Sequence, residues 1–308
     1  MNTREIRNMT QEEWRLLHAN PLVLTASQVP AAVGADRYCT RYMLYHRKKG
    51  NLSWPDESLR FAVGHALEPV IADAFARETG YTVRDPGEYA AIQHPAHPWL
   101  WATPDIIAEI DGVDIPVEIK TTESFTEAAK SFSTGNTPLQ YDVQIQMQMY
   151  IMNSPFAYAV CMRGLGSRGL DIVRVERDDE LINGCVVAAH QFLGDIAAGR
   201  EPEPGGTDAD SDAIRHLYPA DDGGTVTLDV DEWRERLERL EQAKREAKAI
   251  NDVICEIENQ LKAAIGDHTY AVCGDVSFSY RTQERKGYVV QPTIFRALRK
   301  VSKKENES

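Results

Sequence analysis

The chain has few cysteines for its length, and none of them is paired in sequence. The 308 residues include five cysteines, an odd number, and no two of them form a C-x-x-C pair. They are Cys39, Cys161, Cys185, Cys255 and Cys273. This spacing argues against a disulfide framework and against a zinc or iron–sulfur site.

The sequence also lacks a long apolar run and an excess of positive charge. No stretch approaches the roughly 20 apolar residues that a membrane span needs, and the first residues, MNTREIRNMTQEEW, are charged throughout, unlike a signal peptide. We therefore expect a cytoplasmic protein without a membrane partner. With 34 Lys and Arg against 47 Asp and Glu, the net charge of −13 gives no general attraction to nucleic acid. Any DNA binding must be local.

What the sequence does contain falls into three stretches. Residues 1–200 alternate helical and strand-like patterns, whereas residues 201–228 are rich in Pro, Gly and Asp and predict a linker or a long loop. Residues 229–308 begin with apolar residues at three- and four-residue steps, which predict a long helix from about 230 to 265, ended by Gly266. These apolar residues are Val230, Trp233, Leu237, Leu240, Ala247, Ile250, Ile254, Ile257 and Leu261.

The end of the chain combines a hairpin pattern with basic residues. The segment YAVCGDVSFSY alternates around Gly274-Asp275, which predicts a hairpin. The basic residues that follow are Arg281, Arg285, Lys286, Arg296, Arg299, Lys300, Lys303 and Lys304. The last residues, KKENES, are expected to be disordered. We expect this third stretch to serve self-association, DNA binding or partner binding.

Helix signals recur in the first stretch. Thr10 and Glu13 form a capping-box pattern, and a second helix is expected to begin at Ser27, after the apolar LVLTA. A further helix should run over 57–79 and stop at Gly80. Its expected apolar side comprises Leu67, Val70, Ile71, Ala74 and Phe75.

The most informative segment is WLWATPDIIAEIDGVDIPVEIKTT, residues 99–122. Two β-rich runs flank Asp111-Gly112, a strong tight-turn signal, so the segment predicts a hairpin. Asp105 begins one run and Glu118 ends the next, so pairing about the turn brings both carboxylates to the same end of the sheet. Since strand side chains alternate, Glu118 and Lys120 should share a face while Ile119 points into the core.

These residue types suit phosphodiester hydrolysis. Asp105 and Glu118 could hold Mg²⁺ together with the backbone carbonyl of Ile119, and Mn²⁺ should substitute for it. Such a cation polarises a phosphate and lowers the pKa of a bound water, which Lys120 could orient or deprotonate. Taken alone, Pro-Asp is also a common turn pair, and Glu-x-Lys a common pair on an exposed strand. Their combination on a semi-buried strand favours a functional site.

Five motifs in order extend this pattern: Thr25-Ala-Ser27, Gly64-x-x-x-Glu68, Pro104-Asp105, Glu118-Ile-Lys120 and Gln144-Ile-Gln146. Together they resemble the phage lambda-exonuclease and YqaJ-like viral recombinase branch of the PD-(D/E)XK nucleases. The resemblance spans roughly residues 20 to 200. It implies an α/β, restriction-endonuclease-like core with a mixed central sheet flanked by helices, to which the C-terminal long helix and small hairpin are added.

The resemblance also implies roles for individual residues. Asp105 and Glu118 would be direct metal ligands, and Lys120 the water-activating residue. Glu68 would bind at a second metal position or through water, and Gln144 would hold the lysine or the attacking water. Ser27 would approach a DNA phosphate. Without the family pattern, Glu68 reads equally well as a solvated helix residue, two of the three glutamines as a polar exposed face, and Ser27 as an ordinary N-cap.

DNA contacts are expected from a run of basic residues without any acid. This run comprises Arg37, Arg41, Arg47, Lys48 and Lys49. An ordinary solvated helix end is the competing interpretation. Lambda-type enzymes carry an arginine shortly before the Thr-Ala-Ser triplet that helps anchor the 5′ phosphate. Here NPLVLTAS supplies none, and the nearest is Arg15.

The predicted function is a Mg²⁺-dependent exonuclease that digests double-stranded DNA from its ends, 5′ to 3′, to give single strands for phage-type recombination. The resemblance further implies a single-strand annealing protein as partner and a ring-shaped trimer. One alternative is a RecB/Cas4-like repair nuclease without an iron–sulfur cluster. The other is a non-catalytic DNA-end-binding module with the same fold.

Overall fold

A computed structural model describes the chain apart from residues 1–5, 56–57, 165–168, 285–286, 288–294 and 301–308. The chain divides into two compact units, Met1–Tyr218 and Pro219–Ser308. Several predicted features fall outside the described residues: the helix start at Glu57, the basic residues Arg285, Lys286, Lys303 and Lys304, and the KKENES end.

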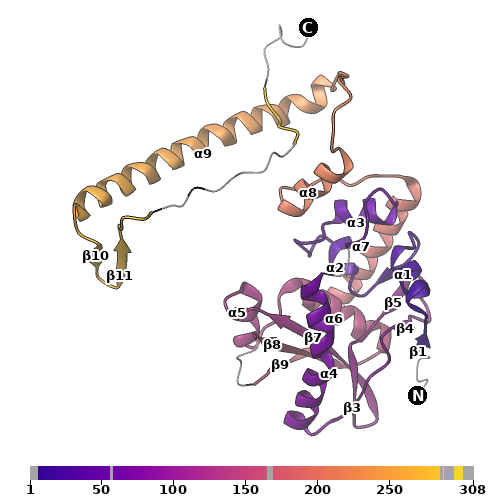
Figure 1. Cartoon of the computed structure of the whole chain (residues 1–308). Helices are drawn as coiled ribbons and strands as arrows, with labels where there is room; N and C mark the ends of the chain where they lie inside the picture. Colours follow the sequence, from indigo (N-terminus) through magenta and orange to yellow (C-terminus); the bar gives the residue numbers. More distant parts are fainter. Residues whose placement is uncertain (1–5, 56–57, 165–168, 285–286, 288–294, 301–308) are drawn as a thin grey trace. The chain divides into compact units, whose positions relative to one another are not determined.

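The first unit is built around a five-stranded mixed sheet with the order β3-β6-β7-β8-β9 (Figure 1). β7 pairs antiparallel with β6 and parallel with β8, which requires a crossover connection between the two parallel strands. The strands are β3 (Thr82–Arg84), β6 (Ile106–Ile110), β7 (Val113–Thr122), β8 (Phe156–Arg163) and β9 (Asp171–Glu176). The crossover carries α5 (Glu127–Ser133) and α6 (Leu139–Met152).

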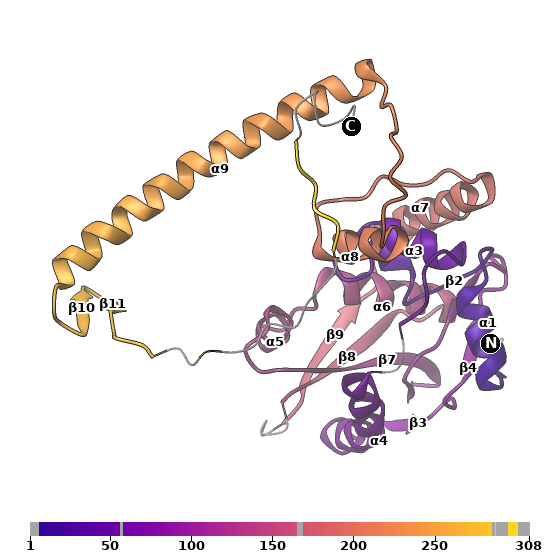
Figure 2. The same cartoon turned by 45° about the horizontal axis from the view of Figure 1, so that its top comes forward.

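Alternate residues of the central strands face two different cores. Val117 and Ile119 of β7 are buried together with Ile71 and Phe75 of α4 (Leu59–Thr79). Ala159 of β8 belongs to the core on the other face, which α5 and α6 cover. Figure 2 shows α4 and α6 on different sides of this sheet. Glu118 and Lys120 alternate with the α4-facing residues, so they face α6.

Among the described residues of the first unit there are also a smaller four-stranded sheet and five more helices. The sheet has the order β1-β4-β5-β2. Its strands are β1 (Ile6–Asn8), β2 (Leu24–Thr25), β4 (Ala90–Gln93) and β5 (Leu100–Ala102). The helices are α1 (Gln11–Ala19), α2 (Val29–Ala32), α3 (Arg41–Lys48), α7 (Asp179–Ala198) and α8 (Asp208–Leu217). Leu24, Leu100, Met147 and Phe192 share one core, so α6 is packed against both sheets.

Among the described residues, α7 is the one helix whose length and hydropathy would suit a membrane span. Its apolar side is used inside the first unit. Ile182, Phe192 and Ile196 are fully buried in the core shared with α6 and the small sheet. We therefore interpret α7 as a core helix, whose amphipathic burial explains its hydropathy.

The hairpin predicted within residues 99–122 is confirmed for β6 and β7, whereas Leu100–Ala102 at the start of this segment form β5 of the small sheet. Asp111 and Gly112 have φ values of 51° and 73°, as a two-residue turn with positive φ at both positions requires. Asp111 tolerates this conformation better than most residues, and Gly112 has no Cβ to oppose it. Pro116 has no N–H to donate, and it lies before the part of β7 that pairs with β8, which starts at Val117.

The helix predictions hold with two corrections. The Thr10–Glu13 capping box is present, and α4 ends at Gly80 in the left-handed conformation. Ser27 does not cap a helix: α2 begins at Val29, and its N-cap residue, Gln28, makes no side-chain cap bond. Val70 was expected on the apolar side of α4 but is 58% exposed, because the buried side of this helix is narrow and runs through Ile71, Ala72 and Phe75.

The predicted linker of residues 201–228 contains α8 and is partly folded onto the core. Asp210 is buried and accepts hydrogen bonds from the Thr40 hydroxyl at 2.5 Å and the Thr207 hydroxyl at 2.8 Å. Ala213 packs with Tyr42 and Met43 of α3. These long-range contacts extend the first unit beyond residue 200, to Tyr218. The Pro-, Gly- and Asp-rich composition did not predict these contacts, because they depend on the burial of one particular acid, Asp210.

In the second unit, the predicted long helix and hairpin are confirmed. α9 (Val230–Ile265) is followed by Gly266 at a φ of 57°, and β10 (Tyr270–Cys273) pairs antiparallel with β11 (Val276–Ser279). Within this unit the apolar residues of α9 are largely exposed; Leu237, for example, is 51% exposed and Ile250 60%. A 36-residue helix with an exposed apolar stripe is a candidate for helix pairing.

Lys48 has a structural role that corrects its predicted role in DNA binding. Its side chain is 4% exposed, and its ammonium group donates to the backbone carbonyls of His18 at 2.6 Å, Asn20 at 3.0 Å and Val23 at 2.8 Å. These carbonyls lie at and just after the end of α1, where the helix has no internal donors for them. Lys48 therefore ties α3 to the end of α1 and is not free for a phosphate.

Replacing Lys48 with Met should lower the free energy of unfolding by about 2 kcal/mol, because three carbonyls lose their shared donor. The exposed neighbour provides a matched control: Lys49→Met should change stability by less than about 0.5 kcal/mol. Urea unfolding followed by circular dichroism measures both values. Equal stability of the two variants would contradict this role for Lys48.

Candidate active site

The pairing of β6 with β7 places two acids opposite each other. Ile106 pairs with Val117, so Asp105, directly before β6, lies opposite Glu118. The Asp105 carboxylate accepts a hydrogen bond from the Ile119 backbone N–H at 2.7 Å. The structure thus brings the predicted Asp105 and Glu118 together through backbone register rather than through a flexible loop.

Glu118 is the most constrained side chain of the site. It is 2% exposed, and its Oε1 accepts hydrogen bonds from Lys120 Nζ and, at 2.7 Å, from Gln144 Nε2. Its Oε2 accepts one from Gln148 Nε2 at 2.6 Å. A buried carboxylate needs such donors, since burial without them disfavours the charged form. Gln144 therefore holds Glu118 directly, and the role that the family resemblance suggested, holding the lysine or the attacking water, stays a prediction.

Lys120 shares the face of Glu118, as predicted. Burial alone would lower the pKa of Lys120, but the charges of Glu118 and Asp105 and the hydrogen bond to Glu118 together raise it. Its ammonium group lies 5.0 Å from the centre of the Tyr141 ring, where a cation is also stabilised. Lys120 is therefore held as a cation between two acids and an aromatic ring.

Glu68 reaches the site from α4, the helix on the opposite face of the sheet. Its side chain is 35% exposed and lies 3.9 Å from His65 Nε2. Burial raises the pKa of Glu68, and the nearby charge of Glu118 raises it further. Burial likewise raises the pKa of Asp105 well above its ordinary value, with contributions from Glu118 and Glu68. The charge of Glu118 thus disfavours ionisation of both Glu68 and Asp105.

The donor set fits a hard divalent cation. The carboxyl groups of Glu68, Asp105 and Glu118 all interact electrostatically with Lys120, and a cation with oxygen ligands would favour the charged form of these acids. Among the residues that the structure describes, no three His, Cys, Asp or Glu side chains converge closely enough to bind a metal ion as they stand. The carboxylates are instead bonded to protein donors, which a cation would partly replace.

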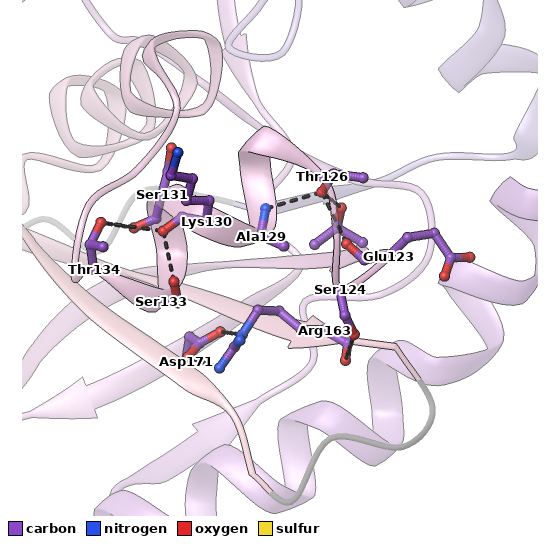
Figure 3. Close-up of polar contacts among 11 residues, drawn as sticks. Glu123, Ser124, Thr126, Ala129, Lys130, Ser131, Ser133, Thr134, Arg163 and Asp171 are labelled. Carbon is purple, nitrogen blue, oxygen red and sulfur yellow. Dashed lines mark hydrogen bonds and ion pairs between the residues drawn. The ribbon is translucent and has the colours of Figure 1, made fainter. Parts of the chain in front are cut away.

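Polar contacts fix the chain directly beyond β7 (Figure 3). Ser124 Oγ donates to the carbonyl of Arg163 at 3.0 Å, and Arg163 in turn forms an ion pair with Asp171. The Thr126 hydroxyl accepts from the Ala129 N–H at 3.1 Å and so caps α5. The Ser124 contact ties the segment after β7 to β8, the Arg163–Asp171 ion pair joins β8 to β9, and the Thr126 cap fixes the start of α5.

The predicted DNA-contacting residues differ in exposure and in hydrogen bonding. Ser27 is exposed, and its hydroxyl lies 2.9 Å from that of Thr25. Arg37 and Lys49 are also exposed. Arg41 is engaged with Asp195 and the Ala32 carbonyl, and Arg47 donates to Cys39 Sγ.

Sequence reasoning missed Gln148, because a pair of glutamines four residues apart can be read as a polar exposed face. Instead, Gln148 is 1% exposed and bonded to Glu118. Gln146 is 2% exposed; its side chain donates to the Glu176 carbonyl and accepts from the Asp178 N–H, which ties α6 to the start of α7. The strongly apolar residues between the three glutamines were the available sign that this helix is buried on several sides.

The sheet order, the flanking helices and the acids with lysine on paired strands define a core of the PD-(D/E)XK nuclease type. Residues 13–155 match the family model of the YqaJ-like viral recombinase domain. The resemblance inferred from the five motifs is thereby confirmed, and the matched segment includes Ser27, Glu68, Asp105, Glu118, Lys120 and Gln144.

Individual relatives agree with this assignment. Uncharacterized protein YqaJ of Bacillus subtilis (strain 168) is 24% identical over 269 residues, which cover 87% of this chain and 82% of the relative. The structure of LHK-Exo in complex with dAMP has a TM-score of 0.51 and 25% identity, over 62% of this chain and 95% of that chain. A second LHK-Exo structure, described as an alkaline exonuclease from Laribacter hongkongensis, has a TM-score of 0.49, 24% identity and the same coverage of 62% and 95%. The family match and the similarity to the LHK-Exo complex with dAMP support a nuclease of the phage exonuclease type.

Replacing Asp105 with Asn should stabilise the metal-free protein at neutral pH. The pKa of Asp105 is raised in the folded state, so the folded protein favours the protonated carboxyl group. The stabilisation from this proton is fully present at a pH below the pKa of the unfolded state. It is lost as the pH rises through the pKa of the folded state. In EDTA at about pH 8, Asp105→Asn should therefore be more stable than the wild type by roughly 1 kcal/mol, and this gain should disappear towards about pH 4.

Denaturant unfolding across this pH range measures the difference. Asp73→Asn, on the exposed side of α4, serves as the control and should show no such gain. A stability gain for Asp105→Asn that stays constant down to low pH would argue against a raised pKa as its cause.

Proposed function

We propose that this protein is a Mg²⁺-dependent exonuclease that digests double-stranded DNA from its ends, in the 5′ to 3′ direction, and leaves single strands for phage-type recombination. The observation that carries this proposal is the buried Glu118, bonded to Lys120, Gln144 and Gln148 and lying opposite Asp105. A buried acid that repels neighbouring acids lowers the stability of a protein, and such residues are typical of active sites.

Asp105 and Glu118 would hold the metal together with the Ile119 carbonyl, and Glu68 would bind a second position directly or through water. The bound metal would polarise the scissile phosphate and acidify a water molecule. Lys120 would orient that water or stabilise the negative charge that develops on the phosphate. Gln144 keeps the Glu118 carboxylate in position for this arrangement.

The DNA would reach the site past Ser27, Arg37 and Lys49, which are exposed. Arg41 and Arg47 would act only if they left their present partners. A single-strand annealing protein as partner, a ring-shaped trimer and a cytoplasmic location are part of the same proposal, supported by the viral recombinase family. The exposed apolar stripe of α9 offers a surface for the annealing protein or for self-association.

End-labelled linear duplex and closed circular duplex, each incubated with Mg²⁺, test the reaction. The wild type should digest only the linear DNA, and it should release label from 5′ ends first. Asp105→Ala and Lys120→Ala should each lose activity by a factor of about 100 or more, because each removes charge from the reacting centre. Asp73→Ala should retain activity.

Cutting of the closed circle would reject the exonuclease assignment in favour of an endonuclease. Full activity of both site variants would reject the site. Binding of DNA ends without any hydrolysis by the wild type would favour the non-catalytic module.

DNA affinity should depend strongly on salt, because local cations must overcome the net negative charge of the chain. In an Asp105→Ala background that cannot cut, the double variant Arg37→Ala/Lys49→Ala should reduce the slope of log affinity against log salt by about 2, or roughly 0.9 for each lost phosphate contact. Fluorescence anisotropy with 5′-phosphorylated and 5′-hydroxyl duplexes measures both the slope and any preference for the 5′ phosphate. An unchanged slope would show that these two residues do not line the DNA path.

A further inference from the structure

We propose that Gln148 is a positioning residue that fixes the Glu118 carboxylate for metal binding, an inference that rests on the proposed metal-dependent function. Gln148 lies one helical turn after Gln144 on α6, so the two side chains are neighbours on the same face of that helix. Both donate to Glu118, one to each carboxylate oxygen. Together they determine where this carboxylate points.

The two oxygens of Glu118 are not equivalent. Oε1 accepts from both Lys120 and Gln144, whereas Oε2 accepts from Gln148 alone among the residues that the structure describes. Since each carboxylate oxygen has about two lone-pair positions, Oε2 retains capacity for a further ligand. Gln148 thus holds the oxygen that has room for a cation.

The side-chain amide of Gln148 donates to Glu118 through its nitrogen, and this orientation leaves its own side-chain oxygen without a donor among the described residues. Its Oε1 is buried and has no hydrogen-bond partner among the described residues. A buried acceptor without a partner is unfavourable, so the requirement of Glu118 for a donor outweighs it. A purely structural glutamine would be expected to satisfy both ends of its amide.

Gln146 shows what such a structural glutamine looks like. It has the same residue type, lies on the same helix and is similarly buried, at 2% exposure against 1% for Gln148. Both ends of its amide are bonded, the donor to Glu176 O and the acceptor to Asp178 N. Gln146 makes no contact with Glu118 among the hydrogen bonds described, so it is a matched control.

The test is binding of Mn²⁺ in the absence of DNA, measured from the electron paramagnetic resonance signal of the free ion. Gln148→Met keeps the length of the side chain and removes the donor. We expect this variant to bind Mn²⁺ about 10- to 100-fold more weakly than the wild type, the usual effect of losing a group that orients a metal ligand. Gln146→Met should bind as tightly as the wild type, even if its unfolding temperature is lower.

Two further proteins make the result decisive. Asp105→Ala defines the weak background binding of an acidic surface, which is subtracted. If Gln148→Met does not fold, as judged by circular dichroism, Gln148→Asn replaces it; the shorter amide cannot reach Glu118 in the same way, and a similar loss is expected.

The outcomes separate the two proposals. Wild-type affinity in a folded Gln148 variant would overturn the positioning role and leave the metal site intact. Equal losses in the Gln146 and Gln148 variants would also overturn it, since the effect would then reflect the packing of α6. A wild type that binds no more Mn²⁺ than Asp105→Ala would overturn the metal-dependent function itself.

Discussion

The structure of the first unit depends on keeping one ionisable carboxylate, that of Glu118, inside a mixed sheet. Its position on β7 follows from the register with β6, which also sets Asp105 opposite it. Its charge is balanced by Lys120 on the same strand and by two amides from α6. Because a buried acid without donors is strongly unfavourable, the strand pairing and the packing of α6 have to be correct together.

α6 connects these requirements to the rest of the fold. It is the crossover helix between the parallel strands β7 and β8, and it also packs against the small sheet, α2 and α7. Gln144 and Gln148 of α6 donate to Glu118, whereas Gln146 bonds to the segment that leads into α7. A helix that is packed closely on several sides fixes the position of its polar side chains more tightly than an exposed loop does. On the α6 side the site is buried and hydrogen-bonded, whereas the Glu68 side chain on α4 is 35% exposed.

Basic residues show how local composition can mislead. Five cations between Arg37 and Lys49 suggested a DNA-binding face, yet Lys48 is buried against the end of α1, and Arg41 is paired with Asp195 from α7. In the opposite sense, the acidic, Pro/Gly-rich stretch after residue 200 suggested a linker, yet Asp210 docks α8 onto α3. In both cases the deciding partner lies far away in the sequence, at a distance that periodicity cannot detect.

The sequence by itself determined the elements whose cause is local. Asp111-Gly112 specified the turn, alternation put Glu118 and Lys120 on one face, and the spacing of apolar residues specified α9. It also indicated the family, because five short motifs occur in order. Tertiary structure alone decided which polar residues are buried and what they bond to. Gln148 on Glu118 and Lys48 on three carbonyls are contacts between separate elements, at buried sites where polar groups need hydrogen-bond partners.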